Sequence, residues 1–247
     1  MTSTMMLSQA EVASCVSVAT VTDWVEYVFR EWGNGDVVMP AKITLDMVRS
    51  GIDSWSNAMP AYLVSEGIAG MKWVGGFPAN AGTDLPYIMG IIVLTDTASG
   101  RTVAVMDGGH ITTERTGASA AVSVRHLASM PVRNVAIVGA GGQGRSCATY
   151  LHALYPDAAF RVADIDPGAQ RAFVAEMSAS LGTDIQPTDS EQAICGADVI
   201  VIVTTATRPF IRSDWIGPGA TVLAMSSFQQ IEADFALAAD KIVPDSW

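Results

Sequence analysis

A glycine-rich stretch in the second half of the chain, "NVAIVGAGGQGRS", has the spacing of a phosphate-binding turn. An apolar segment leads into Gly139, Gly141 and Gly144, the three glycines of a GxGxxG pattern. The first glycine permits a tight turn and the second lets a pyrophosphate approach the backbone. The third lets the following helix pack on the strand. The pattern alone also occurs in ordinary tight turns, but an apolar strand before it and a helix after it favour a dinucleotide site.

An acidic residue follows at the spacing that such a site requires. The next expected strand, "AFRVADID", brings Asp164 twenty positions after Gly144. A carboxylate there can bind a ribose 2'-hydroxyl and would repel a 2'-phosphate, so the sequence predicts NAD rather than NADP. Asp166 is the competing candidate, although Pro167 favours a role for it at the start of the following helix.

A lysine in the first half of the chain stands among apolar neighbours. In "AGMKWVGGFPAN", Lys72 lies between Met71 and Trp73, and strand alternation puts it on the same face as Val74. Such a lysine either extends its ammonium group to water from a sheet edge or lines a pocket. In a pocket, burial lowers the proton affinity of the amine towards that of a general acid or base. The residues alone leave both interpretations open.

Arg115 is a second cation of the first half that could act on a substrate. It lies in "GGHITTERTGASAA", near the start of a helix expected over Thr113–Leu127. A helix start offers free N–H groups and positive potential, and an arginine adds a bidentate clamp for a carboxylate. A solvated arginine paired with Glu114 in the first helical turn is the equally open alternative.

The composition predicts a folded chain with a large core and an acidic surface. Its 247 residues are 49% hydrophobic and 16% charged, and the formal net charge of -11 disfavours nucleic acid as a partner. No apolar run approaches the roughly 18 residues of a membrane span. The three cysteines lack CxxC spacing and are typical of reduced thiols in a cytoplasmic protein, and no metal site is expected.

The periodicity of the sequence changes between its two halves. Residues 1–130 are expected to form an α+β domain, and residues 131–247 an α/β domain with a doubly wound parallel sheet of the Rossmann type. Capping boxes predict helix starts at Ser8–Glu11 and Asp23–Glu26, and glycines at 33 and 35 end the second helix. Strands of an antiparallel or mixed sheet are expected at 61–64, 68–74, 88–94 and 102–106, and parallel strands at 135–138, 160–163, 199–203, 221–225 and 241–243.

Taken together, three stretches of the chain resemble the ornithine cyclodeaminase/mu-crystallin family over essentially the whole length. They are "MKWVGGFPAN", "LPYIMGIIVLTDTASGRTVAVMDGGHITTERTGASAA" and "VAIVGAGGQG", in the order and spacing of the family. The resemblance implies a homodimer whose N-terminal domain supplies the dimer interface and the substrate site, and a Rossmann domain that holds a nicotinamide cofactor. It also implies hydride exchange between the nicotinamide and an amino-acid carbon, through an imine.

The resemblance also implies roles for single residues. Lys72 matches the family lysine at the substrate carboxylate or reacting centre, and Arg115 matches the arginine near carboxylate and cofactor. Lys42, in "MPAKITL", stands where the family has a substrate-anchoring arginine, so the charge is kept without the bidentate fork. The other matches are to cofactor-contacting positions: Thr116 after the arginine, Gly142 and Gln143 at the pyrophosphate, Asp164 at the ribose, and Thr204 and Thr205 beside the cofactor.

Three departures from the family bear on activity. Tyr87 stands where many members carry "LPT", and Phe228, in "AMSSF", stands where cyclodeaminases and archaeal alanine dehydrogenases place an aspartate. A phenyl ring cannot move a proton, which argues against cyclodeamination. The chain also ends at Trp247, before the usual C-terminal segment of the family, which would lie near the nicotinamide.

Three functions remain as hypotheses. The leading one is an NAD(H)-dependent oxidoreductase acting on the C–N bond of an α-amino or α-imino acid, in the manner of an amino acid dehydrogenase or ketimine reductase. The second is an ornithine or lysine cyclodeaminase that recycles its NAD in place. The third is a cofactor-bound binding protein, like mu-crystallin in its hormone-binding role, or an inactive short relative.

Overall fold

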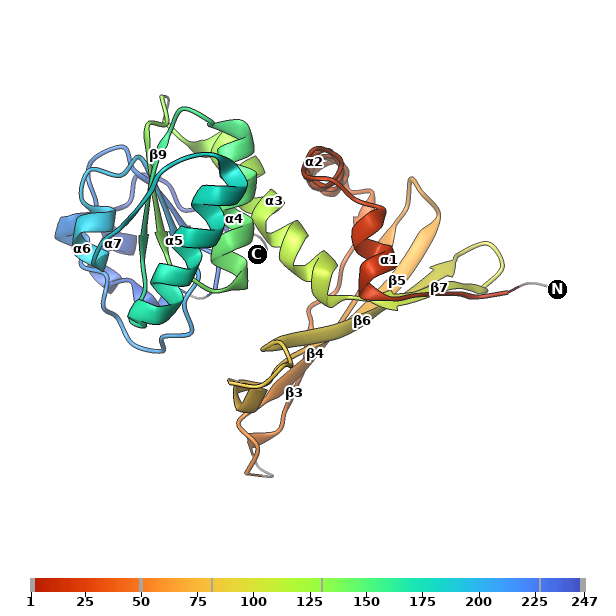
Figure 1. Ribbon diagram of the computed structural model, residues 1–247. Coiled ribbons are helices and arrows are strands. Elements are labelled where there is room, and N and C mark those ends of the chain that lie inside the picture. The colour runs from red at the N-terminus through yellow and green to blue at the C-terminus, as the bar shows by residue number, and fades with distance from the viewer. Residues whose placement is uncertain (1–2, 49–50, 81, 130, 227, 245–247) are drawn as a thin grey trace. The chain divides into compact units, whose positions relative to one another are not determined.

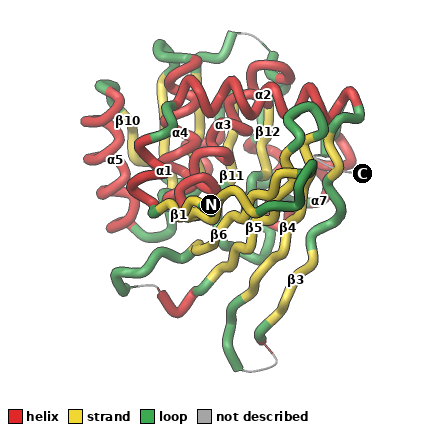
Figure 2. Tube along the Cα trace, turned by 90° about the vertical axis from the view of Figure 1, so that its right-hand side faces the viewer, coloured by secondary structure: helices red, strands yellow, loops and turns green. Residues whose placement is uncertain are grey.

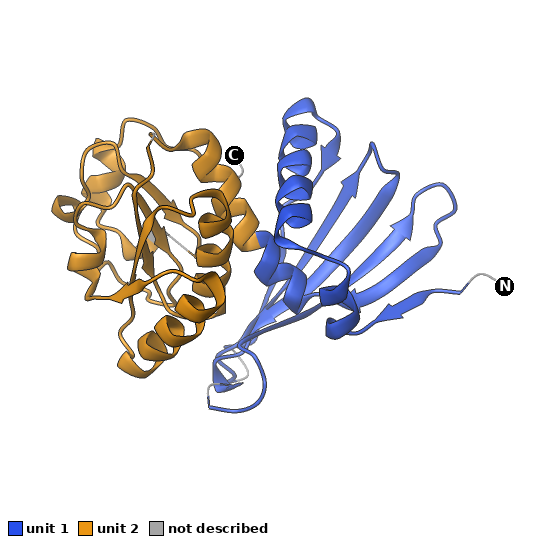
Figure 3. Cartoon of the chain, turned by 45° about the horizontal axis from the view of Figure 1, so that its top comes forward, with its two compact units in different colours: residues 1–115 blue, residues 116–247 orange. Residues whose placement is uncertain are grey.

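The structure, a computed structural model, describes residues 3–48, 51–80, 82–129, 131–226 and 228–244. The side chain of Phe228, as well as Trp247, lies outside this description, so the predictions that rest on them stay predictions. The chain divides into two compact units, Met1–Arg115 and Thr116–Trp247 (Figure 3). The division falls inside helix α3 (Gly109–Leu127), whereas the sequence placed it in the loop after that helix. Within the second unit α3 packs closely on helix α4 (Gly142–Leu154). The evidence is that a Cβ added to Gly117 of α3 would lie 2.2 Å from Ser146 Oγ of α4.

Unit 1 is built on a mixed seven-stranded sheet, as the sequence predicts. The strand order is β1-β7-β6-β5-β4-β2, with β3 also paired to β4, and only the β1–β7 pair is parallel. Strands β3 to β6 lie side by side in Figure 2. The elements are β1 (Met5–Leu7), α1 (Gln9–Ser14), α2 (Val18–Asn34), β2 (Val37–Val38), β3 (Ile43–Asp46), β4 (Trp55–Leu63), β5 (Ile68–Gly76), η2 (Pro78–Asn80), β6 (Ile88–Asp96) and β7 (Thr102–Asp107).

The two N-terminal helices begin at capping boxes, but only one of these boxes was predicted correctly. Ser8 and Glu11 form the expected box before α1. The expected box at Asp23 and Glu26 is wrong: both lie inside α2, which begins after Ser17. The side chains of Ser17 and Thr20 each accept the backbone N–H of the other and so form the capping box. The free N–H groups at the start of the helix are therefore satisfied six residues before Asp23. Helix α2 ends as expected, with Gly35 in the left-handed conformation (φ 87°).

Strand β4 starts six residues before the expected segment, at Trp55 rather than residue 61. Pro60 argues against a strand at this point of the sequence, because proline lacks the N–H group that the interior of a sheet uses. In the structure Pro60 pairs with Met71 of β5 on one side. On the other side it falls between the residues that pair with β3 and those that pair with β2. A missing N–H is therefore tolerated at this position.

Unit 2 is a doubly wound α/β unit, which confirms the predicted fold class. Its five strands are all parallel, in the order β10-β9-β8-β11-β12. Figure 1 shows α4 and α5 on one side of this sheet and α6 and α7 on the other. After α3 the elements are β8 (Asn134–Val138), α4 (Gly142–Leu154), β9 (Ala159–Ala163), α5 (Pro167–Leu181), β10 (Ile185–Pro187), α6 (Ser190–Ile194), β11 (Val199–Ile202), η3 (Ser213–Trp215), β12 (Thr221–Ala224), η4 (Phe228–Gln230) and α7 (Ala233–Ala238).

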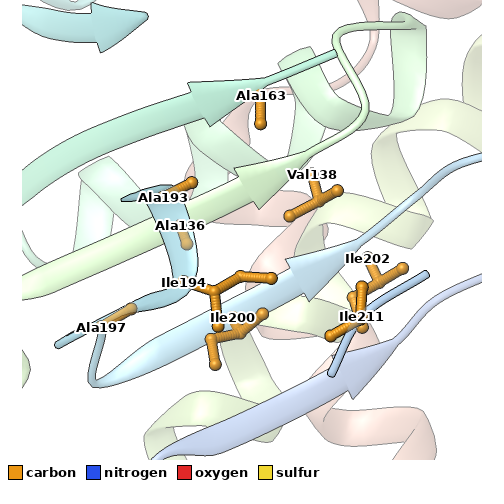
Figure 4. Packing of buried hydrophobic residues seen from close by; sticks show 9 residues of the cluster. All are labelled: Ala136, Val138, Ala163, Ala193, Ile194, Ala197, Ile200, Ile202 and Ile211. Atoms are coloured by element: carbon orange, nitrogen blue, oxygen red, sulfur yellow. The ribbon is translucent and has the colours of Figure 1, made fainter. Parts of the chain in front are cut away.

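The core of unit 2 explains why its strands are continuous apolar runs. Both faces of the sheet are covered, so both sets of alternating side chains must be buried. Figure 4 shows one of the two layers, in which residues of β8, β9 and β11 pack against α6 and Ile211. Helix α4 contacts β8, and helix α5 contacts β9. The sheet therefore holds the carboxyl ends of β8, β9 and β11 in fixed register, and the polar residues that follow these strands come together there.

Two strand predictions in unit 2 need correction. Strand β10 was missed, because it is a three-residue edge strand that ends in Pro187. The strand expected at 241–243 is absent: residues 241–244 have no strand partner, and Ile242 and Val243 are 62% and 56% exposed. A segment without a neighbouring strand cannot satisfy its backbone groups in a sheet. Within the described part of the chain, no helix has the length and apolarity needed to cross a bilayer.

Candidate active site

The glycine-rich turn joins β8 to α4 at the carboxyl end of the parallel sheet. Gly139 has φ 116°, and its N–H donates to the Ala163 carbonyl oxygen at 2.8 Å. A Cβ on Gly139 would lie 2.6 Å from the Val203 carbonyl oxygen, and a Cβ on Gly144 would lie 2.1 Å from the Gly139 carbonyl oxygen. Contacts this short are not tolerated between heavy atoms, so Gly139 and Gly144 are required by the packing of the turn itself.

The opposite side of the same turn is open and suited to an anion. Apart from the adjoining backbone, no atom of the described residues lies within 4 Å of a Cβ placed on Gly141 or on Gly142, and Gly141, the N-cap of α4, provides no side-chain cap. The N–H groups at a helix start attract phosphate through their geometry and through the helix dipole. The uncapped N–H groups at the start of α4, next to the open space at Gly141 and Gly142, fit the pyrophosphate of a dinucleotide.

The predicted ribose-binding acid lies beside this turn. Asp164 is half-buried after β9, and its Oδ2 accepts the Ala140 N–H at 2.6 Å, while its Oδ1 accepts the Asp166 N–H at 2.8 Å. A carboxylate oxygen can accept more than one hydrogen bond, so the group keeps capacity for a ribose hydroxyl. Asp166 serves as the N-cap of α5, accepting the Gly168 N–H at 2.7 Å. The role at a helix start that Pro167 suggested for Asp166 is therefore confirmed.

The remaining cofactor-site candidates of unit 2 lie on two elements. Thr204 and Thr205 follow β11, the first half-buried and the second exposed, and the Thr204 hydroxyl accepts the Ala206 N–H at 3.3 Å. Thr116 is buried in α3. The Val203 N–H donates to the Val138 carbonyl at 2.9 Å, so the segment leading to Thr204 runs beside the end of β8. The structure thus brings the glycine-rich turn, Asp164 and Thr204 to one edge of the sheet.

A buried glutamine that no sequence motif indicated holds the loop after β11. Gln230 is 1% exposed, and its Nε2 donates to the Ala206 carbonyl at 2.5 Å. Its own carbonyl accepts the N–H groups of Phe210 and Ile211, both at 3.0 Å. The loop that carries Thr204 is therefore fixed at its middle and at its end. No local pattern marks Gln230, because its partners lie far away in the sequence.

Unit 1 brings two further cations to bear on Lys72. The side chain of Lys72 is half-buried in β5, and burial lowers the pKa of its ammonium group from its usual value to about 8. The positive charges of Arg115 and then of Lys42 lower this pKa further. Because both charges act on the same amine, the three cations form one cluster, to which Lys42 contributes from the exposed segment before β3. Such a cluster attracts a carboxylate.

Strand register places Lys72 on the covered face of the sheet. Lys72 pairs with Met59 of β4 and with Ile92 of β6, and Val74 on the same face of β5 is 4% exposed. Its neighbours Met71 and Trp73 point to the other face and are 39% and 38% exposed. Of the two interpretations that the sequence left open, this placement favours a lysine that lines a partly buried site.

The placement of Arg115 corrects the sequence analysis. Helix α3 begins at Gly109 rather than at residue 113, so Arg115 lies in its second turn and not among the free N–H groups of a helix start. The reason is Asp107, whose Oδ1 accepts the His110 N–H at 3.1 Å and so satisfies the start of the helix earlier. The expected help from the helix dipole is therefore lost. The guanidinium charge itself remains, exposed and acting on Lys72.

The lowered pKa of Lys72 predicts a pH dependence. With a pKa of about 8, the amine carries its proton below about pH 8 and loses it above. If the protonated amine is the active form, kcat/KM for reduction of an imino acid should fall as pH rises through about 8, since kcat/KM reports the free enzyme. Lys72→Arg keeps its charge throughout this range, so any activity that it retains should show no such fall. A fall near pH 8 that persists in Lys72→Arg would assign it to another group.

The parallel sheet and its glycine-rich turn define unit 2 as a Rossmann-type dinucleotide-binding fold, and unit 1 adds an α+β unit with a cationic cluster. The chain belongs to the ornithine cyclodeaminase/mu-crystallin family, whose sequence profile matches residues 2–239. This confirms the family predicted from the sequence.

Individual relatives agree with the family match. Nodulation efficiency protein NfeD of Rhizobium meliloti is 34% identical over 219 residues, which cover 88% of this chain and 67% of that protein. Δ1-pyrroline-2-carboxylate reductase of Thermococcus litoralis, solved with NADH and L-proline, superposes with a TM-score of 0.83 at 29% identity, covering 88% of this chain and 67% of the other. An archaeal alanine dehydrogenase dimer with bound NAD superposes with a TM-score of 0.81 at 29% identity, covering 89% and 66%. The chain thus spans about two thirds of the length of these relatives.

Proposed function

We propose that the protein is an NAD(H)-dependent oxidoreductase that acts on the C–N bond of an α-amino or α-imino acid. One arrangement carries the proposal: a half-buried lysine on the covered face of β5, on whose amine the charges of Arg115 and Lys42 act, in a chain that also has a dinucleotide-binding turn. The family membership and the relatives solved with NADH and L-proline or with NAD support it. The α-imino acid is the reduction substrate, and the α-amino acid is its product.

The cofactor is NAD(H), held by unit 2. The N–H groups at the start of α4, among them those of Gly142 and Gln143, bind the pyrophosphate, and Asp164 accepts a ribose hydroxyl while repelling a 2'-phosphate. Gly139, Gly141 and Gly144 shape the turn, and Thr116, Thr204 and Thr205 are proposed as further contacts, together with Arg115 of unit 1. Hydride exchange with the substrate carbon is the chemistry that the bound nicotinamide supplies.

The cationic cluster of unit 1 binds the substrate. Arg115 and Lys42 hold the carboxylate, and the three adjacent positive charges make an empty cluster unfavourable and an anion-filled one favourable. Lys72 orients the imine and donates a proton at its nitrogen as the carbon is reduced, then regains a proton from water. Its pKa of about 8 suits this role, because a proton donor works best when its pKa lies near the operating pH.

A substrate panel tests the proposal. Purified protein is given NADH, then 2-oxo acids with ammonia or primary amines and preformed cyclic imino acids, and the absorbance of NADH is followed. We expect turnover of at least one imino acid, with NADPH much weaker as cofactor. Tight NADH binding without turnover of any member of the panel would contradict the proposal and favour the hypothesis of a binding protein. Ammonia release from ornithine or lysine without net NADH formation would instead identify a cyclodeaminase.

The outer face of the unit 1 sheet supports a homodimer as the assembly. Register aligns Ile43, Ala58, Trp73 and Ile91 in one row across β3, β4, β5 and β6, on the face opposite Lys72. Ile43 is 70% exposed and Ile91 is 47% exposed. Leu45, Met71 and Met89 on these strands, and Met6 on β1, are also large, apolar and exposed. A contiguous exposed apolar surface of this kind marks a protein interface.

Ile91→Asp tests this interface. We expect wild-type protein to run as a dimer in light scattering after gel filtration, and Ile91→Asp to shift it towards monomer, because the carboxylate would be buried without a partner. Val64→Asp is the matched control: Val64 is 40% exposed but lies after β4, at the turn to β5. Dissociation by both variants, or by neither, would count against this face as the dimer interface.

A cytoplasmic location is proposed from the cysteines. Cys15, Cys147 and Cys195 form no disulfide within the described part of the chain, and Cys147 is buried in α4. Free thiols persist in a reducing compartment.

A further inference from the structure

Arg145, one residue after the last glycine of the fingerprint, holds the glycine-rich turn from outside. Its Nη1 donates to the Ala140 carbonyl oxygen, in the middle of the turn. Its Nε donates to Glu176 Oε2 at 2.7 Å, and its guanidinium lies 5.4 Å from the centre of the Phe173 ring. Glu176 and Phe173 both belong to α5, so this helix anchors the arginine that reaches the turn.

Ala140 is held on both sides of its backbone. It is 1% exposed, and its N–H donates to Asp164 while its carbonyl accepts from Arg145. Both hydrogen-bonding groups of a buried residue are thus satisfied by side chains, where most buried backbone groups use other backbone. Loss of the guanidinium would leave the Ala140 carbonyl buried without this partner. The turn would then have to change its conformation to reach water or another donor.

The position of Arg145 in its helix argues for a specific role. It is the fourth residue of α4, in the first turn, where the helix dipole disfavours a positive charge. The ion pair with Glu176 offsets this disadvantage locally. Glycines flank Ala140 on both sides, and glycine loses more conformational freedom than any other residue when a segment is ordered. A clamp that orders the turn before the ligand arrives lowers the cost of binding.

We infer that Arg145 is a positioning residue that fixes the glycine-rich turn for a dinucleotide by clamping the Ala140 carbonyl. Asp164, which bonds the N–H of the same residue, is thereby held in register with the turn, so the clamp couples the pyrophosphate and ribose subsites. Glu176 and Phe173 act through Arg145 and not on the ligand. The inference rests on the proposed function, because it assumes that the turn binds NAD(H).

The test compares Arg145→Met with a matched arginine elsewhere in unit 2. Arg212 forms a two-bond ion pair with Asp214, at 2.9 and 2.7 Å, and among the described residues it makes no hydrogen bond to the glycine-rich turn, so Arg212→Met removes an ion pair without removing a bond to the turn. We expect the Kd for NADH, measured by calorimetry, to rise about tenfold or more in Arg145→Met and to stay within about twofold in Arg212→Met. Arg145→Lys should recover part of the loss, because it keeps a positively charged donor group on a similar stem. Glu176→Gln should raise the Kd for NADH in the same direction but by less. This variant replaces Arg145→Met in the comparison if Arg145→Met does not fold.

A second readout does not depend on the cofactor. In the ligand-free protein, amide hydrogen exchange over residues 139–144 should quicken in Arg145→Met and remain unchanged in Arg212→Met. An unchanged Kd and unchanged exchange in Arg145→Met would overturn the inference. A loss of NADPH affinity much larger than the loss for NADH would also overturn it, since Arg145 would then bind a 2'-phosphate. If wild-type protein binds no NADH at all, the proposed function fails, and the exchange measurement alone decides whether the clamp exists.

Discussion

Lys72→Met is expected to lower kcat/KM for imino-acid reduction by about a thousandfold, within the range typical of a side chain that transfers a proton. The methionine fills a similar volume on the covered face of β5 but supplies neither a proton nor a charge. The affinity for NADH should stay within about twofold, because the proposed dinucleotide contacts of unit 2 are untouched. Initial rates across a substrate series, together with calorimetric NADH titrations, measure both quantities.

Arg101→Met is the control for this variant. Arg101 is an exposed cation of unit 1 in the turn between β6 and β7, so its loss removes the same charge from outside the cluster. Its activity should stay within about twofold of wild type. A Lys72→Met protein that keeps more than a tenth of the wild-type kcat/KM would exclude Lys72 as the proton donor. Lys72 would then have a role in substrate binding alone.

Gly144→Ala and Gly142→Ala should separate folding from cofactor binding. A methyl group at position 144 would lie 2.1 Å from the Gly139 carbonyl oxygen, so the turn must move, at an expected cost of about 2 kcal/mol in unfolding free energy. For a chain of this size we expect Tm to fall by about 4–8 °C. The affinity for NADH should fall by about a hundredfold, because the displaced turn no longer presents its N–H groups to the pyrophosphate.

At position 142 a methyl group meets no atom of the described residues within 4 Å beyond the adjoining backbone, and alanine is favoured over glycine in a helix by about 1 kcal/mol. Gly142→Ala should therefore keep or raise Tm while it lowers NADH affinity about tenfold, since the methyl would occupy the space proposed for the phosphates. Gly217→Ala, another substitution into open space in unit 2, should change neither quantity. Equal effects of the Gly142 and Gly144 variants on Tm would contradict this account of the turn.

The features that the sequence predicted correctly depend on local constraints. The glycine-rich turn needs its residue types at fixed spacing because each one serves the same strand, turn and helix. The cap of α5 was also predictable, since Asp166 precedes Pro167. Local rules failed where two caps compete. Asp23 has the right residue type for a helix start, but Ser17 closes its box first, and Asp107 likewise moves the start of α3 ahead of residue 113.

The environment of the candidate site depends on contacts that a single sequence does not reveal. The pKa of Lys72 is set by burial within the sheet and by the charges of Arg115, in α3, and of Lys42, before β3. The sequence did not indicate a role for Arg145, because its ion-pair partner Glu176 lies 31 residues away on α5. Gln230 reaches a carbonyl 24 residues earlier in the chain. Residue type and spacing therefore predicted the groups that carry the chemistry better than the groups that hold them in place.

The crowded positive charge around Lys72 also has a thermodynamic consequence. Its pKa is about 8 in the folded protein, whereas the unfolded chain restores the ordinary value of 10.5, so the unfolded state holds this proton more firmly. By linkage, the free energy of unfolding rises as pH increases from about 8 towards 10.5. Below pH 8 the amine is charged in both states, so the full free-energy cost of holding this charge in the folded protein applies there. The protein thus tolerates a repulsive, partly buried cation at neutral pH. Anionic ligands that enter the cluster should relieve this repulsion and show themselves as thermal stabilisers before any turnover is detected.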